Sequence, residues 1–261
     1  MGLTVATWNV NSIRARMEQV LSWIDSRRPD VLLMQETKVV DSLFPVEPFR
    51  ERGYDTASSG QKTLNGVAVA SRHGLEVIRT GLASRFLDDQ KRVLLARTAG
   101  ITVMSVYVPN GGDPSLARFA DKLAFLGELA LEASEEARRG PFLMAGDFNV
   151  APGDEDVDDP VAMDGHICFH PEERARFGGI LDAGLTDLFR MFNPAGRAFS
   201  WWDYREGSFR RNIGMRLDHV LASQDLAGAA VSCGIDREPR GWEKPSDHAP
   251  VVAVFDLPGT E

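Results

Sequence analysis

The chain has 261 residues, 43% of them hydrophobic and 26% charged, which is enough to bury a sizeable core and typical of a globular protein. Its formal net charge of −9, taken alone, argues against a nucleic-acid partner, because such proteins usually have a basic balance. Its two cysteines form no disulfide framework or zinc motif, and no apolar run approaches the roughly 18 residues of a membrane span. We therefore expect a cytoplasmic protein without membrane attachment.

The apolar pattern predicts strands and helices in alternation. The first strand runs over residues 3–8 and stops at Asn9. A helix follows, which we expect to be capped at Ser12 and to stop at Pro29. Further helices are predicted over residues 115–138 and 172–184, with an acidic loop over 151–168. Further strands are predicted over residues 31–34, 66–71, 76–80, 92–98, 101–108, 142–145, 216–222 and 250–255.

Two features organise these elements. Ala99-Gly100 separates two predicted strands by a pair of residues, which favours a hairpin. No linker-like stretch interrupts the chain, so we expect a single α/β domain over residues 1–261, with mixed sheets. Nothing in the sequence indicates an oligomer, and we expect a monomer.

Polar residues stand where the predicted strands end or begin. In sheet enzymes, side chains at strand ends converge on a ligand. Oxygen ligands dominate this set, and it contains no cysteine and few histidines, so Mg²⁺ or Mn²⁺ suits it better than zinc. The residues are Asn9, Glu36, Tyr107, Asp147, Asn149, Asp218, Asp247 and His248.

Each of these residues also has a purely structural interpretation. Glu36 alone could be a surface carboxylate, and Asp147 with Asn149 could form an Asx-turn. Tyr107 could be a core aromatic residue with its hydroxyl group at the surface. Asp218 is harder to explain in this way, because a carboxylate within an apolar strand needs a partner. The coincidence of so many polar strand ends favours a site.

Ten short segments, in order from residue 8 to residue 248, resemble the exonuclease III family of DNA repair nucleases. This family belongs to the endonuclease/exonuclease/phosphatase superfamily. The segments are Trp8-Asn9-Val10-Asn11, Gln35-Glu36-Thr37-Lys38, Gly60-Gln61-Lys62, Asn65-Gly66-Val67-Ala68, Tyr107-Val108-Pro109-Asn110, Gly146-Asp147-Phe148-Asn149, Pro171-Glu172-Glu173-Arg174, Phe199-Ser200-Trp201-Trp202-Asp203-Tyr204-Arg205, Arg216-Leu217-Asp218-His219 and Lys244-Pro245-Ser246-Asp247-His248.

The resemblance implies a DNase I-like, four-layer α/β sandwich, in which two packed mixed sheets are flanked by helices. It also implies an enzyme that depends on Mg²⁺ or Mn²⁺ and acts on double-stranded DNA. Such an enzyme would hydrolyse phosphodiesters 5′ to abasic sites and at 3′ ends, as an AP endonuclease, a 3′-5′ exonuclease and a 3′-phosphatase.

The resemblance further implies roles for individual residues. The primary metal-ligand positions are Asn9, Glu36 and Asp247. The residues that prepare the attacking water and hold the phosphate are Asp147 and Asn149, which also match a second metal position. The phosphate-binding histidine, a possible further metal ligand, is His248, with Asp218 as its partner and Tyr107 close to the attacked phosphate. The DNA-contacting positions are Trp201 and Met215 in the wall of the sugar pocket, together with Arg92, Asn110 and Lys38.

Two other functions remain open at this point. A metal-dependent phosphoesterase of a small or lipid substrate would share the metal and histidine residues, but residues 35–38 and 201–205 resemble the DNA branch. A non-catalytic relative would lack some site residues, and here every position is filled. The acidic net charge weighs less than the basic residues near these segments.

The segment over residues 164–170 departs from the family pattern. It contains two histidines, and we hypothesise that His166 sets the ratio of exonuclease to endonuclease activity. The alternative is that His166 is an exposed loop residue without a role.

Overall fold

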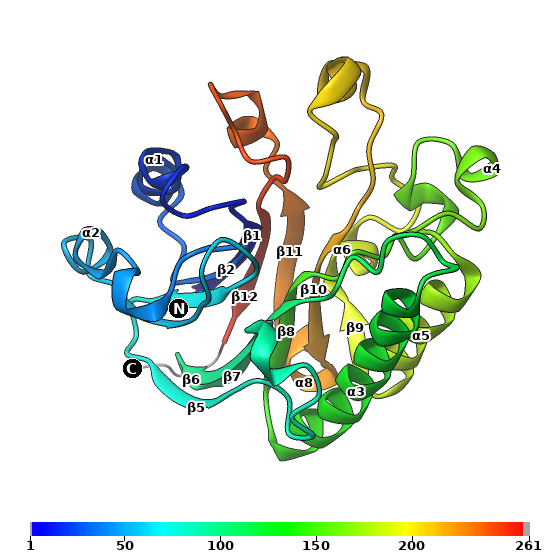
Figure 1. The fold of residues 1–261 in the computed structure, drawn as a ribbon. Helices are drawn as coiled ribbons and strands as arrows, with labels where there is room; N and C mark the ends of the chain where they lie inside the picture. Colours follow the sequence, from blue (N-terminus) through cyan, green and yellow to red (C-terminus); the bar gives the residue numbers. More distant parts are fainter. Residues whose placement is uncertain (1, 258–261) are drawn as a thin grey trace.

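The computed structural model describes residues 2–257 as a four-layer sandwich, in which two sheets pack face to face and helices cover both outer faces (Figure 1). The first sheet has the strand order β11-β12-β1-β2-β4-β3, and its only parallel pair among the described strands is β1 with β2. Its strands are β1 (Gly2–Asn9), β2 (Val31–Gln35), β3 (Asp55–Ser59), β4 (Val67–Ser71), β11 (Ala230–Ile235) and β12 (Val251–Asp256).

The second sheet repeats this plan, with the order β5-β6-β7-β8-β10-β9 and a parallel pair of β7 with β8. Its strands are β5 (Glu76–Thr80), β6 (Val93–Thr98), β7 (Ile101–Tyr107), β8 (Phe142–Asp147), β9 (Leu185–Asp187) and β10 (Asp218–Ser223). The predicted hairpin joins β6 to β7, and both Ala99 and Gly100 have the positive φ angles that such tight turns require.

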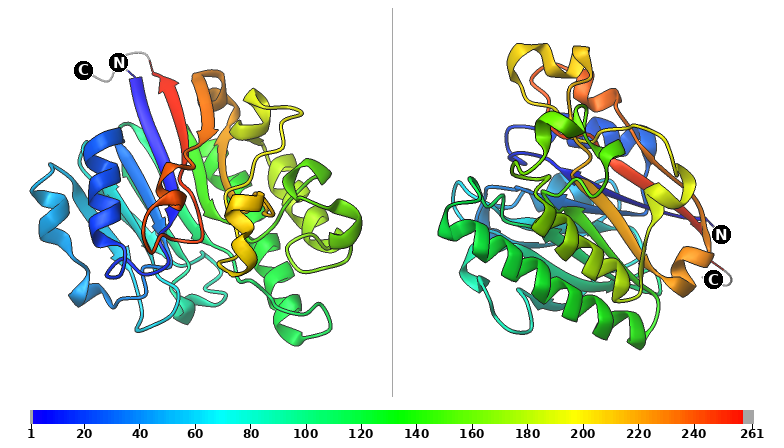
Figure 2. Two further views of the ribbon diagram at one scale, coloured as in Figure 1. Left: turned by 90° about the horizontal axis from the view of Figure 1, so that it is seen from above. Right: turned by 90° about the vertical axis from the view of Figure 1, so that its right-hand side faces the viewer.

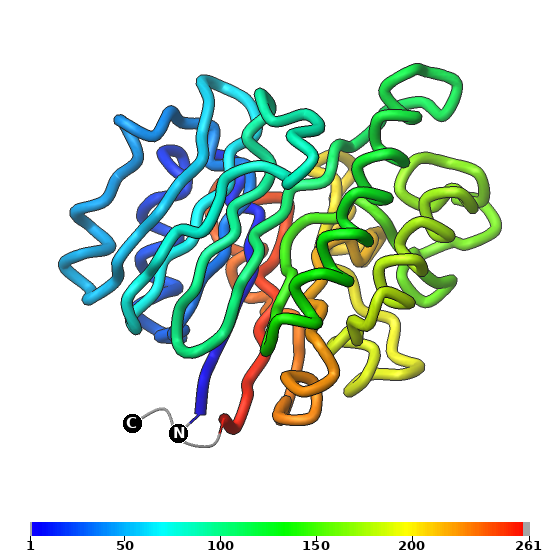
Figure 3. The backbone as a smooth tube through the Cα atoms, turned by 90° about the horizontal axis from the view of Figure 1, so that it is seen from below, coloured from blue at the N-terminus to red at the C-terminus, as the bar shows by residue number. Residues whose placement is uncertain are grey.

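Helices form the outer layers. Figure 2 shows α3 and α5 side by side over the second sheet, with α1 and α2 on the opposite side of the molecule. Figure 3 follows the chain from β1 to β12, whose antiparallel pairing places Gly2 beside Asp256. The helices are α1 (Met17–Arg27), α2 (Val46–Arg50), α3 (Ala117–Arg139), α4 (Pro160–Met163), α5 (Pro171–Asp182), α6 (Leu188–Phe192), α7 (Ser208–Arg211) and α8 (Gln224–Gly228).

Strand β2 explains why the central strands are apolar throughout. Successive side chains of a strand point to opposite faces of the sheet. Val31 and Leu33 therefore pack between the two sheets, whereas Leu32 and Met34 pack on the side of α1. A third apolar cluster lies between the second sheet and α3 and α5, around Phe125. A strand buried on both faces reads as one continuous apolar run. Among residues 2–257, no helix is both long and apolar enough to cross a bilayer.

Two predictions about elements were wrong, and three strands were missed. The first helix begins at Met17 rather than after Ser12, because Ser12 has a φ of 85° and lies in a turn that precedes the helix. The segment over residues 151–168 contains the short helix α4, capped by the side chain of Asp159, in place of a continuous loop. Strands β3, β9 and β11 were not predicted: few side chains of β3 and β11 are buried, and β9 has only three residues.

The topology brings the polar strand ends together. Strands β1 and β2 run in parallel, as do β7 and β8, so Asn9 and Gln35 end one pair and Tyr107 and Asp147 end the other. Strand β10 is antiparallel to β8, so its first residue, Asp218, pairs with Asp147.

Candidate active site

A cavity of about 370 Å³ lies where these strand ends meet. Its polar side is formed by residues that the sequence analysis singled out, and its other side is largely apolar. The polar lining is Glu36, Tyr107, Asn110, Asp147, Asn149, His166, Asp247 and His248. The remaining lining is Ala162, Met163, Ile167, Cys168, Trp201, Met215 and Leu217.

Glu36, Asp147 and His248 form the centre of the polar side. Their ligand atoms all lie within 4.8 Å of one another, close enough for a single metal ion to contact all three. The amide nitrogen of Asn9 donates to both carboxylates, at 2.8 Å to Glu36 and 2.9 Å to Asp147. Nζ of Lys38 lies 2.7 Å from the other oxygen of Glu36. The donors are carboxylate and imidazole groups, which suit a divalent cation.

Asp247 lines the same cavity but does not belong to this three-residue cluster. One of its carboxylate oxygens accepts from the side-chain amide of Asn11 at 2.9 Å, and the other from the indole N–H of Trp201 at 3.1 Å. Nζ of Lys38 donates to the side-chain oxygen of Asn11 at 2.6 Å and also binds Glu36. Asn11 therefore links Asp247 to Lys38 and, through Lys38, to Glu36. Asn11 received no role in the sequence analysis, although it belongs to the first matched segment.

His248 and Asp218 form a buried pair. Nδ1 of His248 lies 2.8 Å from Oδ2 of Asp218, which confirms the contact that the sequence analysis predicts. The hydroxyl of Ser200 accepts from the backbone N–H of Asp218 and fixes the start of β10. Nε2 of His248 lies 3.7 Å from Asp147, inside the cavity. Burial would lower the pKa of His248, but the carboxylates of Asp218 and Asp147 outweigh it and raise this pKa to about 10.

Burial raises the pKa of the two acidic groups beside His248, Asp147 and Tyr107. It raises the pKa of Asp147 to about 7, and the charges of Asp218 and Glu36 add to the shift while His248 opposes it. It also raises the pKa of Tyr107 well above its usual value, with Glu36 and Asp147 contributing. Tyr107 is therefore a protonated hydrogen-bond donor at neutral pH.

Asn149 and Asn110 are fixed by each other and by the backbone. The amide of Asn110 donates to the side-chain oxygen of Asn149 at 3.2 Å, and the amide of Asn149 donates to the carbonyl of Val108 at 3.0 Å. Asn149 has a φ of 51°, in the left-handed region that asparagine tolerates better than most residues.

The predicted DNA-contacting residues divide into two groups. Trp201, Met215 and Asn110 line the cavity, and Trp201 forms a backbone bridge with Met215. Arg92 does not line it: its guanidinium lies over the ring of Tyr107, 4.8 Å from the centroid, and donates to the backbone carbonyl of Tyr107 at 3.1 Å. Lys38 is held by Glu36 and Asn11, as described above. Leu217 was missed, although it lies two residues after Met215 on the same side of an extended segment.

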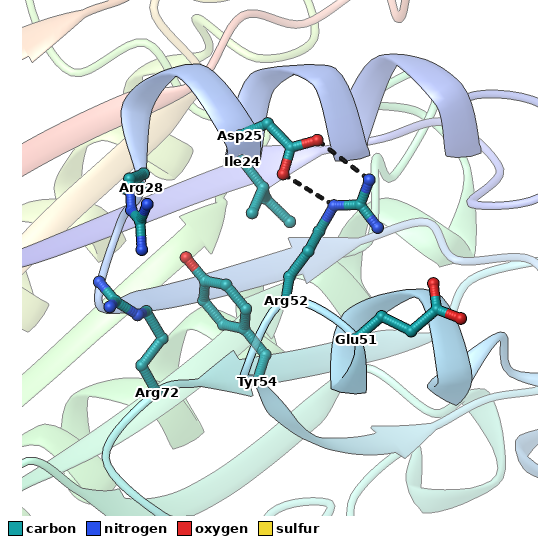
Figure 4. A pocket seen from close by; sticks show the side chains of 7 residues that line it. All are labelled: Ile24, Asp25, Arg28, Glu51, Arg52, Tyr54 and Arg72. Atoms are coloured by element: carbon teal, nitrogen blue, oxygen red, sulfur yellow. Dashed lines mark hydrogen bonds and ion pairs between the residues drawn. The ribbon is translucent and has the colours of Figure 1, made fainter.

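A second cavity, of about 280 Å³, lies at the opposite end of the first sheet (Figure 4). Three arginines surround Tyr54 there, but two of them have acidic neighbours. Arg52 binds Asp25 through two hydrogen bonds, and Arg72 lies 3.8 Å from Asp30. No residue that the sequence analysis singled out lines this cavity, so we place the candidate site in the larger one.

Comparison with known proteins shows the family to which the chain belongs. Residues 6–248 match the endonuclease/exonuclease/phosphatase family. The exodeoxyribonuclease III of Haemophilus influenzae is 38% identical over 262 residues, covering 95% of this chain and 98% of that protein. Among solved structures, an AP endonuclease from Archaeoglobus fulgidus is 41% identical, with a TM-score of 0.94, and the match covers 98% of this chain and 100% of the other. A 3′ phosphatase from Neisseria, bound to a product DNA hairpin, is 38% identical, with a TM-score of 0.95 and the same coverage.

Proposed function

Because the chain belongs to the endonuclease/exonuclease/phosphatase family, we propose that it is a metal-dependent DNA repair nuclease of the exonuclease III type. Its substrate is double-stranded DNA with abasic sites or 3′ ends. It hydrolyses the phosphodiester 5′ to an abasic site and removes nucleotides or phosphate groups from 3′ ends. The names of its relatives, which include exodeoxyribonuclease III, AP endonucleases and a 3′ phosphatase, support this function in base excision repair.

We propose that the metal is Mg²⁺ or Mn²⁺ and that Asn9, Glu36 and Asp247 are its primary ligands. Asp147, with its neighbour Asn149, is positioned to share this ion or to hold a second one, and His248 would join them only in its neutral form, as the alternative to the phosphate-binding role below. The fit rests on the two carboxylates of the buried cluster: burial raises the pKa of Asp147, the charges of Asp218 and Glu36 add to the shift, and a divalent cation would oppose it. When bound, the ion neutralises charge on the phosphate and lowers the pKa of a water molecule.

Asp147 is the proposed acceptor of the water proton. Its Oδ1 accepts from the backbone N–H of Asn149 at 2.9 Å, and its Oδ2 accepts from Asn9, so the carboxylate is held in one orientation. The carboxylate lies in the cavity, where it can orient a water molecule and accept its proton. Its place in the cavity beside His248 puts it next to the proposed phosphate position.

His248 is the proposed phosphate-binding group. Because its Nδ1–H donates to Asp218, the Nε2–H of the imidazolium is left to donate to a phosphate oxygen. Asn149 and Tyr107 add donors where negative charge develops during hydrolysis. Tyr107 can do so because its raised pKa keeps the hydroxyl protonated.

The apolar wall suggests how an abasic site is selected. Trp201, Met215 and Leu217 line the cavity beside the polar cluster. A sugar without a base loses no pairing and little stacking when it leaves the helix, so it is the least costly nucleotide to extrude. We propose that this wall receives the extruded sugar, while Asn110, Arg92 and Lys38 contact the DNA near it.

We further propose that the enzyme is a cytoplasmic monomer with one catalytic domain. A phosphoesterase of a small or lipid substrate is disfavoured, because two relatives that match over nearly the whole chain are named as an exodeoxyribonuclease III and an AP endonuclease.

The observation that carries the proposal is the meeting of the Glu36–Asp147–His248 cluster with an apolar wall in one cavity. A gel assay tests it with two duplexes, one with a single abasic site and one with a recessed 3′ end, in Mg²⁺ and in chelator. We expect Mg²⁺-dependent cleavage that Asp147→Asn abolishes. Absence of cleavage of both duplexes by folded protein would contradict the proposal and favour a small-substrate phosphoesterase.

A further inference from the structure

Lys122 and Glu173 form an ion pair in which both side chains are fully buried, with 0% exposure. Lys122 lies on α3 and Glu173 on α5, beneath the loops that surround the cavity. Burying two charges is unfavourable unless their geometry and remaining hydrogen bonds compensate, and apolar residues often stabilise such a position as well or better. The pair therefore calls for an explanation other than stability.

The ammonium group of Lys122 uses its three donors on three different partners. It contacts Oε1 of Glu173, and it donates to the backbone carbonyl of Asn149 at 2.7 Å and to that of Asn110 at 3.1 Å. Asn149 follows β8 and Asn110 follows β7, and the side chains of both line the cavity. The buried ammonium group of Lys122 thus binds the backbone of two loops that line the cavity.

Glu173 extends this connection to a third segment. Its second carboxylate oxygen accepts from the backbone N–H of His170 at 3.0 Å, at the start of α5. The residues just before His170 include His166, Ile167 and Cys168, which line the cavity. The pair therefore joins the three segments that form one side of the site.

The left-handed backbone conformation of Asn149 gives the hydrogen bond from Lys122 a specific role, which is to restrain that conformation. Its φ of 51° is uncommon for a residue other than glycine, and such a conformation persists only when its surroundings hold it. The bond from Lys122 to its carbonyl is one such restraint. The stem of Lys122 also approaches Gly111 so closely that a Cβ there would lie 3.0 Å from the lysine Cδ.

We propose that Lys122, paired with Glu173, is a positioning residue that holds the backbone of Asn149 and Asn110, and with it their side chains, in place at the cavity. This inference rests on the proposed nuclease function. It implies that Lys122 acts on the chemical step through Asn149, because Asn149 donates where charge develops. Loss of Lys122 should therefore lower kcat more than it raises KM.

The test uses Lys122→Met together with Glu173→Gln, because the double variant leaves no unpaired buried charge. Single-turnover rates and KM are measured on the abasic duplex in saturating Mg²⁺, alongside unfolding in urea. We expect kcat to fall by about 10- to 100-fold, as for other residues that orient ligands, with KM changed less than about threefold. The matched control is Arg79→Met with Glu132→Gln, which removes an ion pair between β5 and α3 that does not line the cavity.

The decisive arm combines the double variant with Asn149→Ala. Because Lys122 also holds Asn110, the combined variant should be only slightly slower than Asn149→Ala, by much less than the loss that the double variant causes in the unmodified enzyme. Fully additive losses would overturn the inference, as would a folded Lys122→Met/Glu173→Gln variant whose kcat stays within about twofold of wild type. Failure of the proposed function is distinct, because the unmodified enzyme would then cleave neither duplex.

Discussion

Oδ2 of Asp218 lies 2.8 Å from Nδ1 of His248, whereas Oδ1 of Asp218 has no hydrogen-bond partner among residues 2–257. The imidazolium of His248 therefore provides most of the interaction that offsets the cost of burying the carboxylate of Asp218. Asp218→Asn should lower kcat on the order of 100-fold or more, because it removes the charge that keeps His248 protonated. The exposed Asp225→Asn on α8 provides a control.

The pH dependence of this variant gives a sharper test. The pKa of His248 is raised to about 10, so its stabilising contribution is complete below the unfolded pKa of about 6.5 and is lost as pH rises through the folded value. In Asp218→Asn this pKa should fall, so His248 loses its proton near neutral pH. The ratio of wild-type to variant kcat/KM should therefore increase with pH between about 5.5 and 8. A ratio that does not change with pH would contradict this account.

Metal titration can test whether Asp247, a metal ligand implied by the family resemblance, contributes as much to metal binding as Glu36, which belongs to the Glu36–Asp147–His248 cluster. Glu36 belongs to the three-residue cluster and Asp247 does not, although both oxygens are engaged in each carboxylate, by Asn9 and Lys38 in Glu36 and by Asn11 and Trp201 in Asp247. Glu36→Gln should therefore raise the Mg²⁺ concentration for half-maximal activity by about tenfold or more, and Asp247→Asn should raise it less. The measurement is cleavage of the abasic duplex across a Mg²⁺ series. An equal or larger effect of Asp247→Asn would place Asp247 at the centre of the metal site.

The sequence predicted the central strands well and the edges poorly. Strands such as β2 are buried on both faces, so their apolar runs are unambiguous. In β3, by contrast, Asp55–Ser59 is a run of small and polar residues at the edge of a sheet, without the alternation that indicates a strand. Pairing with the fully buried β4, the next strand in the chain, decides its conformation. The early start predicted for α1 failed for a related reason, since Ser12 is a common capping residue whose positive φ is set by the loop.

The site was predictable where its residues stand at strand ends, and less so where they come from helices. Asp147 and His248 follow or precede apolar runs, and the topology alone brings them together. Lys122 lies in a long amphipathic helix, where a lysine normally reads as a solvent-exposed residue. Its burial depends on the packing of α3 against α5, which single-sequence patterns do not encode.

His166 lies exposed at the rim of the cavity, which leaves the hypothesis about it open and gives it a direct test. Removing the side chain should widen the entrance and change how a flanking nucleotide sits. We expect His166→Gly to change the ratio of abasic-site incision to 3′-5′ exonuclease rate by about threefold or more, equivalent to about 0.65 kcal/mol. Asp164→Gly adds a glycine to the same loop without touching the cavity, and should leave the ratio unchanged. An unchanged ratio in His166→Gly would mean that the histidine is a loop residue without this role.

Acid stability should depend on the buried guanidinium of Arg216, which lies behind the cavity wall. It binds Asp187 at 2.7 Å and Asp156 at 2.6 Å and 3.1 Å. Burial would raise the pKa of both carboxyl groups, but the charge of Arg216 outweighs it and lowers both. Their contribution to stability is therefore present above the unfolded pKa of about 3.9 and is lost as pH falls through the lower folded values.

Asp187→Asn leaves Arg216 partly unpaired, so it should destabilise the fold by about 3–5 kcal/mol at pH 7. Urea unfolding from pH 7 down to about pH 3 checks this. The difference between wild type and variant should shrink as the pH falls below about 4, and a difference that stays constant would show that the charge of Asp187 contributes nothing to stability.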